Sequence, residues 1–123
     1  MKFQPDRSEA QSIQAYGPGW ISVDGERITH SVIIGSNGLR QPWRCERFED
    51  LGPEHFAQLA NLDAELIIFG SGVRNRFPSP AWLAPLIARR LGLETMDTPA
   101  ACRTYNILAS EGRNVVAALI LEG

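Results

Sequence analysis

Short segments rich in apolar and β-branched residues make up the first third of the chain. Asp24-Gly25 separates two of them, and this pair is typical of a type I′ hairpin turn because both central residues need a positive φ. A third segment ends at the turn residues 35–38, and residues 39–51 show no regular alternation. The pattern therefore predicts an antiparallel hairpin and one further strand. The predicted strands occupy residues 20–23, 27–29 and 31–34.

The second half of the chain changes to the helical period. Two of its helices begin at Ser79-Pro80 and Asp97-Thr98-Pro99, where a capping side chain precedes a proline suited to the first turn. Gly92 and Gly112 are expected to end them. The apolar faces consist of Phe56, Leu59 and Ala60 in a first helix and of Leu83, Leu86 and Ile87 in a second. The predicted helices occupy residues 53–62, 79–90 and 98–110.

Strands are predicted between and after these helices, at residues 66–69, 93–96 and 115–121. The last is apolar on both faces, so it should be covered on both sides and lie near the centre of a sheet. The order is a hairpin followed by β-α-β-α-β, which favours an α/β fold with a mixed central sheet. Residues 12–123 are expected to form one such domain, and residues 1–11 a loose segment.

Composition excludes several classes of protein. Hydrophobic residues make up 44% of the 123 residues and charged residues 21%, as in ordinary globular domains. Twelve basic and fourteen acidic residues give a net charge of −2, which argues against a nucleic-acid partner. The longest apolar run is residues 115–121, too short for membrane insertion. The first eleven residues contain no apolar signal segment, so the expected compartment is the cytoplasm.

The nucleophilic and metal-binding side chains form no complete site. Cys45 and Cys102 make no CxxC pair, and with His30 and His55 they lack the paired spacing of a zinc site. Cys102 shares its predicted helical arc with apolar residues, which indicates a small core residue rather than a nucleophile. Ser71 stands in no nucleophile elbow. We expect two reduced thiols, no metal and no cofactor, and a non-enzyme is favoured.

The residues after the strands at 66–69 and 93–96 form the one candidate ligand site. Gly70-Ser71-Gly72 resembles a phosphate-cradling turn, but Asn75 stands where a dinucleotide fingerprint needs glycine, so a tight turn is the simpler interpretation. The arginines that follow are solvated loop charges or anion ligands, and Asp97 is a helix cap or a ligand contact. The candidate ligand-binding residues are Gly70, Ser71, Gly72, Arg74, Arg76, Asp97 and Thr98. They would line a crevice between loops 70–76 and 97–99.

Several stretches resemble a known family of small domains. They are residues 96–108 (MDTPAACRTYNIL), 111–113 (EGR), 116–120 (VAALI), 66–72 (LIIFGSG) and 13–23. The sequence resembles, over residues 12–122, the family that includes mitochondrial complex I assembly factor three. The resemblance implies a three-layer α/β fold with a mixed central sheet. It also implies a non-catalytic, protein-binding or assembly-type role, linked to membrane-protein or respiratory-complex biogenesis. The alternative is a small-molecule or anion-binding protein that uses the crevice.

Overall fold

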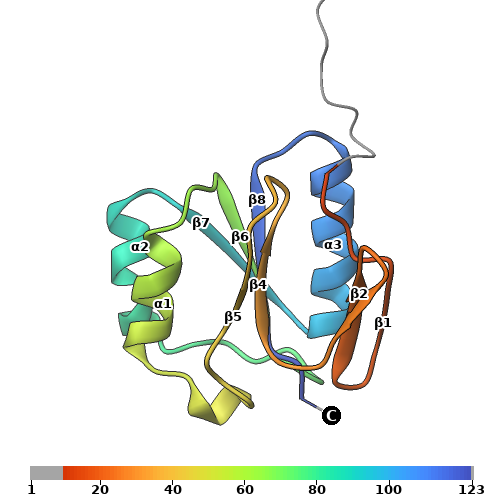
Figure 1. The fold of residues 1–123 in the computed structure, drawn as a ribbon. Coiled ribbons are helices and arrows are strands. Elements are labelled where there is room, and N and C mark those ends of the chain that lie inside the picture. The colour runs from red at the N-terminus through yellow and green to blue at the C-terminus, as the bar shows by residue number, and fades with distance from the viewer. Residues whose placement is uncertain (1–9, 123) are drawn as a thin grey trace, which may run out of the picture.

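A five-stranded mixed sheet forms the centre of the computed structural model, which describes residues 10–122 (Figure 1). Its strand order is β5-β4-β8-β6-β7. The strands are β4 (Val32–Gly35), β5 (Arg40–Pro42), β6 (Leu66–Gly70), β7 (Gly92–Met96) and β8 (Val115–Leu119). Strands β6, β7 and β8 are parallel, whereas β4 is antiparallel to both β5 and β8. The mixed sheet confirms the predicted fold class.

The predicted hairpin is present, but it is not part of the central sheet. Strands β1 (Ala15–Gly17), β2 (Trp20–Val23) and β3 (Glu26–Ile28) form a separate antiparallel sheet. Asp24 and Gly25 have φ values of 53° and 78°, as their turn requires. The hairpin cannot extend the central sheet beside β4, because both edges of β4 are already paired, with β5 and β8. The central sheet is mixed because β4 runs antiparallel to both of its neighbours, β5 and β8.

Helices cover both faces of the central sheet, which makes three layers. In Figure 1, α1 (Pro53–Ala60) and α2 (Ala84–Ala88) lie on one face, and α3 (Thr98–Ser110) lies on the other beside β1–β3. Residues 10–122 also contain two short 3₁₀ helices, η2 (Phe48–Asp50) and η3 (Pro80–Leu83). The small sheet therefore contributes to the α3 layer.

The prediction of one continuous helix at residues 79–90 is wrong. It consists of η3 followed by the five-residue α2. Pro85 has no N–H group to donate to the carbonyl of Ala81, and its ring would clash with that carbonyl in a continuous α-helix. Ile87 is 69% exposed and does not share the buried face of Leu86, contrary to the prediction. Gly92 is the first residue of β7, and Arg90 takes the left-handed conformation, with φ 55°, after the helix.

Strand β8 lies at the centre of the sheet, as predicted from its apolar run. All of its residues are fully buried. Alternate side chains enter two core clusters: Val115, Ala117 and Leu119 pack on the side of α3 and the small sheet. Val116, Ala118 and Ile120 pack on the side of α1 and α2. One strand therefore connects both cores.

The predicted loose segment lies outside the described residues except for Ala10 and Gln11. The amide of Gln11 donates to the carbonyls of Gly35 and Leu39, at 2.9 and 2.8 Å. Its own carbonyl accepts a hydrogen bond of 2.6 Å from the Tyr105 hydroxyl. Gln11 is therefore tied to β4 and α3. No helix within residues 10–122 is long and apolar enough to cross a bilayer.

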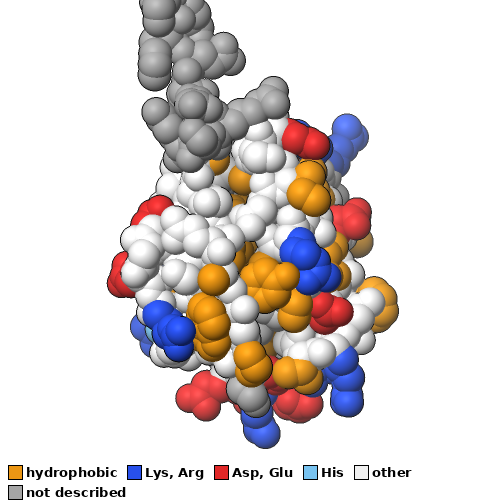
Figure 2. Space-filling model, turned by 90° about the vertical axis from the view of Figure 1, so that its right-hand side faces the viewer, with side chains coloured by type: hydrophobic (Ala, Val, Ile, Leu, Met, Phe, Trp, Pro, Cys, Tyr) orange, Lys and Arg blue, Asp and Glu red, His pale blue; other side chains and the backbone are white. Residues whose placement is uncertain are grey.

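Large apolar side chains remain exposed at several places on the surface. Among the described residues they are Tyr16, Val73, Phe77, Ile87 and Ile107. Figure 2 looks onto the side of the molecule where Figure 1 shows the small sheet and α3, and apolar side chains gather on the lower half of this face. This surface lies at the end of the sheet where the candidate loops are found.

Candidate functional site

The carboxyl ends of the three parallel strands meet at one edge of the sheet, here called the carboxyl edge. Gly70 at the end of β6 pairs with Met96 of β7 on one side and with Leu119 of β8 on the other. Helix α3 begins directly after β7. Ligands of open α/β sheets bind outside such strand ends. The loops at 70–76 and 97–99 are thus neighbours, as expected if their strands are parallel.

Direct hydrogen bonds join these two loops. The Ser71 N–H donates to the Met96 carbonyl at 2.8 Å, and the Thr98 N–H donates to the Gly72 carbonyl at 2.8 Å. The Gly72 N–H donates to Thr98 Oγ1 at 2.9 Å, and that hydroxyl donates to the Ile120 carbonyl at 2.8 Å. The N–H groups of Ser71, Gly72 and Thr98 are therefore used within the protein, and the available space lies to either side.

Ser71 holds the turn after β6. Its side chain is fully buried, and Oγ donates to the Arg74 carbonyl at 2.8 Å while it accepts from the Arg76 N–H at 2.9 Å. A ring nitrogen of His30 and one of His55 bond backbone carbonyls elsewhere. Among residues 10–122 neither histidine bonds a serine hydroxyl, which agrees with the tight-turn interpretation.

Arg76 is held in place at the carboxyl edge rather than free in solvent. One Nη group donates to the Ser71 carbonyl at 2.7 Å and to the carboxylate of Glu122, and the other lies 3.4 Å from Glu49 Oε2. Its guanidinium carbon is 4.7 Å from the centroid of the Phe48 ring. With only 16% of its side chain exposed, Arg76 connects the loop to the chain after β8. The interpretation of Arg76 as a solvated charge is wrong.

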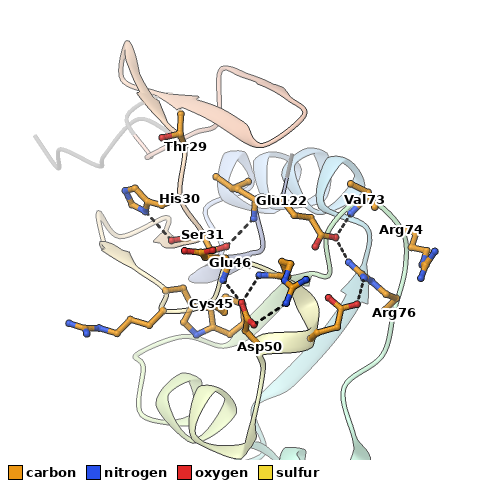
Figure 3. Close-up of a pocket in the computed structure, with 15 residues that line it drawn as sticks. Thr29, His30, Ser31, Cys45, Glu46, Asp50, Val73, Arg74, Arg76 and Glu122 are labelled. Atoms are coloured by element: carbon orange, nitrogen blue, oxygen red, sulfur yellow. Dashed lines mark hydrogen bonds and ion pairs between the residues drawn. The ribbon is translucent and has the colours of Figure 1, made fainter.

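Arg74 and Asp97 behave differently from Arg76. Figure 3 shows Arg74 turned away from Glu122 and Arg76, and Arg74 has no ion-pair partner among residues 10–122. Asp97 occupies the N-cap of α3, where its carboxylate accepts a hydrogen bond of 2.8 Å from the Ala100 N–H. The capping interpretation of Asp97 is confirmed.

Two cavities flank the linked loops, and Val73, Leu121 and Glu122 line both. The larger, here called the wide pocket, has a volume of about 1060 Å³ and opens between the loop after β6 and residues 43–50 (Figure 3). The smaller, here called the hairpin groove, has a volume of about 290 Å³ and lies between the β1–β2 turn and the start of α3. Its lining residues are Tyr16–Trp20, Gly72, Val73, Thr98, Pro99 and Ile120–Glu122.

Opposite charges are balanced in the wide pocket. Its lining includes four arginines and four acids, namely Arg44, Arg47, Arg74, Arg76, Glu46, Glu49, Asp50 and Glu122. Hydrogen bonds from the Glu46 and Arg47 N–H groups, at 3.0 and 3.1 Å, lower the pKa of Asp50. Within residues 10–122 no three His, Cys, Asp or Glu side chains are placed to hold a metal ion. The pocket therefore presents no concentrated charge of either sign.

The hairpin groove was missed by reasoning from the sequence. Its signal is Gly17-Pro18-Gly19, a turn sequence after which Trp20 pairs with Gly17. A Cβ atom on Gly17 would overlap the Trp20 ring, so any other residue at this position would force that ring to move. The Tyr16 hydroxyl accepts a hydrogen bond of 2.8 Å from Arg103 of α3. The hydrogen bond between Tyr16 and Arg103 thus joins the β1–β2 hairpin to α3, and both elements line the groove.

Both cysteines are free and buried. The burial of Cys102 agrees with its predicted place in the core. We expect both thiols to react slowly with a chromogenic disulfide reagent at pH 8 in the folded protein and rapidly after denaturation. Thiolate is the reacting form, and burial raises the pKa of Cys45 and of Cys102 to about 12. At pH 8 only about one folded thiol in ten thousand is then ionised. Rapid labelling of Cys102 in the native protein would contradict its assignment to the core.

The protein is thus a three-layer α/β domain in which the Ser71 side chain stabilises the turn after β6. Residues 13–120 match the family described as "Protein of unknown function (DUF498/DUF598)", and the chain belongs to this family. A crystal structure of a Bordetella parapertussis protein is 37% identical, with a TM-score of 0.84, and the match covers 92% of this chain and 97% of that one. The solution structure of a Bordetella pertussis protein, a Mth938-like domain, is 34% identical with a TM-score of 0.81, over 100% and 94% of the two chains.

A longer relative carries a functional name. NADH dehydrogenase (ubiquinone) 1 alpha subcomplex assembly factor 3 of Bos taurus is 31% identical over 120 residues, which cover 96% of this chain and 65% of the relative. The chain thus spans less than two thirds of the length of the bovine, mouse and human relatives of that name. The resemblance found in the sequence is confirmed.

Proposed function

We propose that this protein is a non-catalytic binding domain of the assembly-factor type, and that the hairpin groove is its docking surface for a partner protein. The observation that carries the proposal is an apolar groove at the carboxyl edge with exposed apolar side chains at its margin. Val73 is 65% exposed and Tyr16 36% exposed. Exposed apolar patches with polar margins are typical of protein-interaction sites.

The relatives support the assembly part of this proposal. The bovine, mouse and human relatives are named as assembly factors of NADH dehydrogenase, and each aligns with nearly the whole of this chain. We therefore propose a role in the biogenesis of a membrane-bound respiratory complex. The buried, hydrogen-bonded Ser71 and the two buried thiols support a role without covalent catalysis.

Deletion of the gene in its native host tests this role. We expect less assembled NADH:ubiquinone oxidoreductase in membranes, measured by native gel and by NADH oxidation. The wild-type gene should restore assembly, whereas Val73→Gln should restore it poorly, because losing one apolar anchor of an interface weakens binding about 5- to 30-fold.

Ile107→Gln is the matched control. It changes another exposed aliphatic side chain, which is 58% exposed on α3 and does not line the groove. We expect it to restore assembly fully. Normal assembly in the deletion strain would overturn the proposed role, and equal rescue by Val73→Gln and Ile107→Gln would overturn the groove as the docking surface.

The second candidate function is anion binding beside the linked loops 70–76 and 97–99. The observation in its favour is Arg74, a guanidinium without an ion-pair partner within the described residues, which lines the wide pocket bordering these loops. Titration with phosphate and with ATP should then shift the amide resonances of residues 70–76 and 97–100. Arg74→Gln should abolish these shifts and Arg90→Gln should not. If no amide resonance shifts at millimolar ligand, anion binding is overturned and protein binding remains as the proposed function.

A further inference from the structure

We propose that the hairpin groove selects a partner segment in which apolar side chains are flanked by acidic residues, with Arg27 and Arg103 as the specificity-determining residues. This inference rests on the proposed function, since it names the chemistry of the partner at the same surface. It rests on three observations. They are the size and lining of the groove, an arginine in contact with each of its two aromatic residues, and the pairing of the nearby acidic residues with other groups.

The groove suits apolar side chains rather than a backbone or a large ligand. Its volume of about 290 Å³ lies at the lower limit of small-molecule pockets, which hold about 300–1,000 Å³. The N–H groups of Gly72, Val73 and Thr98 are already bonded within the protein. Pro18 and Pro99 have none. A partner is therefore recognised here by its side chains.

Each of the two aromatic residues that line the groove contacts an arginine. Arg103 donates a hydrogen bond of 2.8 Å to the Tyr16 hydroxyl, and this bond raises the pKa of the guanidinium. The guanidinium carbon of Arg27 lies 4.1 Å from the centroid of the Trp20 ring. Both arginines are exposed, and neither has a carboxylate within ion-pair distance among residues 10–122. Each aromatic residue of the groove lining thus has one positive charge in contact with it.

The acidic residues around the groove interact with groups other than Arg27 and Arg103 at hydrogen-bond or ion-pair distance. Glu122 binds Arg76, and Asp97 caps α3, although its charge also acts on Arg103 at longer range. Asp24 and Glu26, on the same small sheet as Arg27, both pair with Arg40. The protein carries a net charge of −2, yet within the described part of the chain these two arginines have no ion-pair partner. Charge complementarity therefore favours acidic residues in the bound segment.

Selection from a phage-displayed library of random 12-residue peptides on the immobilised protein tests the inference. We expect the selected peptides to be enriched in apolar residues with Asp or Glu nearby, and their binding to shift the amides of residues 16–20 and 72–73. Arg27→Gln and Arg103→Gln should each weaken the best peptide about three- to fivefold, as for exposed ion pairs, and high salt should remove the difference. Arg90→Gln, which changes an exposed arginine on the opposite face of the sheet, should have no effect.

The outcomes separate this inference from the proposed function. Apolar peptides that need Val73 but show no acidic enrichment, or that bind the two arginine variants normally, overturn the charge selection and leave the docking surface intact. Peptides that shift no groove residue overturn both. Dimerisation of the protein that is lost in Val73→Gln would identify a second copy as the occupant and would also overturn the inference.

Discussion

Ala118→Asp is expected to abolish folding. Ala118 is fully buried in β8, paired with Ile33 on one side and Phe69 on the other. A carboxylate there enters the core cluster that α1 and α2 cover, whose described members are all apolar and cannot pair with it. The effective cost of burying such a charge is several kcal/mol, against a total stability of about 5–15 kcal/mol for a typical domain. Circular dichroism should show no cooperative unfolding transition.

Ala57→Asp is the matched control, because it makes the same chemical change at an exposed position of α1. We expect its unfolding midpoint to stay close to that of the wild type, since surface substitutions usually change stability by less than about 0.5 kcal/mol. A folded Ala118→Asp protein with a wild-type midpoint would contradict the central position of β8.

Thr98→Val should give the second largest effect, a loss of about 2–5 kcal/mol, because it leaves two buried backbone groups without partners. The Thr98 hydroxyl accepts from the Gly72 N–H and donates to the Ile120 carbonyl, and the residue is only 8% exposed. Valine has nearly the same shape and places no group that can replace either bond. Urea denaturation should show a lower midpoint at an unchanged slope.

Thr98→Ser keeps the hydroxyl and loses only a methyl group. We expect it to retain most of the stability that Thr98→Val loses. Equal losses in the two variants would show that keeping the hydroxyl does not preserve stability. That result would argue against the hydroxyl as the link between the loop after β6, the chain after β8 and the start of α3.

The proposed docking surface depends on this link. Val73 follows Gly72 in the chain, and its N–H donates to Glu122 at 3.2 Å, while Glu122 also binds Arg76. The loop that presents Val73 to solvent is therefore bonded to α3 through Thr98 and to the end of β8 through Glu122. Such a surface is formed before a partner arrives, so less of the binding free energy is spent on ordering it.

Local chemistry explains most of what was predicted correctly. The central position of β8 follows from an apolar run that needs cover on both faces. The turn at Asp24-Gly25 follows from a backbone conformation that few residue pairs adopt, and the cap at Asp97 follows from the unpaired N–H groups of a helix start. The meeting of the loops at 70–76 and 97–99 follows from the parallel strands that precede them. The break at Pro85 was also readable locally, from the missing N–H group of proline.

Tertiary structure alone decided the rest. The hairpin became a separate sheet because β5 and β8 occupy both edges of β4, which no local pattern of residues 20–29 indicates. The sequence around Arg76 predicts only a loop charge. Its partner Glu122 lies in the chain after β8 and meets it only in the folded protein. The hairpin groove likewise needs the β1–β2 turn and the start of α3 in one place. Turns, caps and buried faces depend on neighbouring residues and can be read from the sequence. Ion pairs and grooves between distant segments depend on how the layers pack, so the sequence determined the elements of this protein and the packing determined its surface.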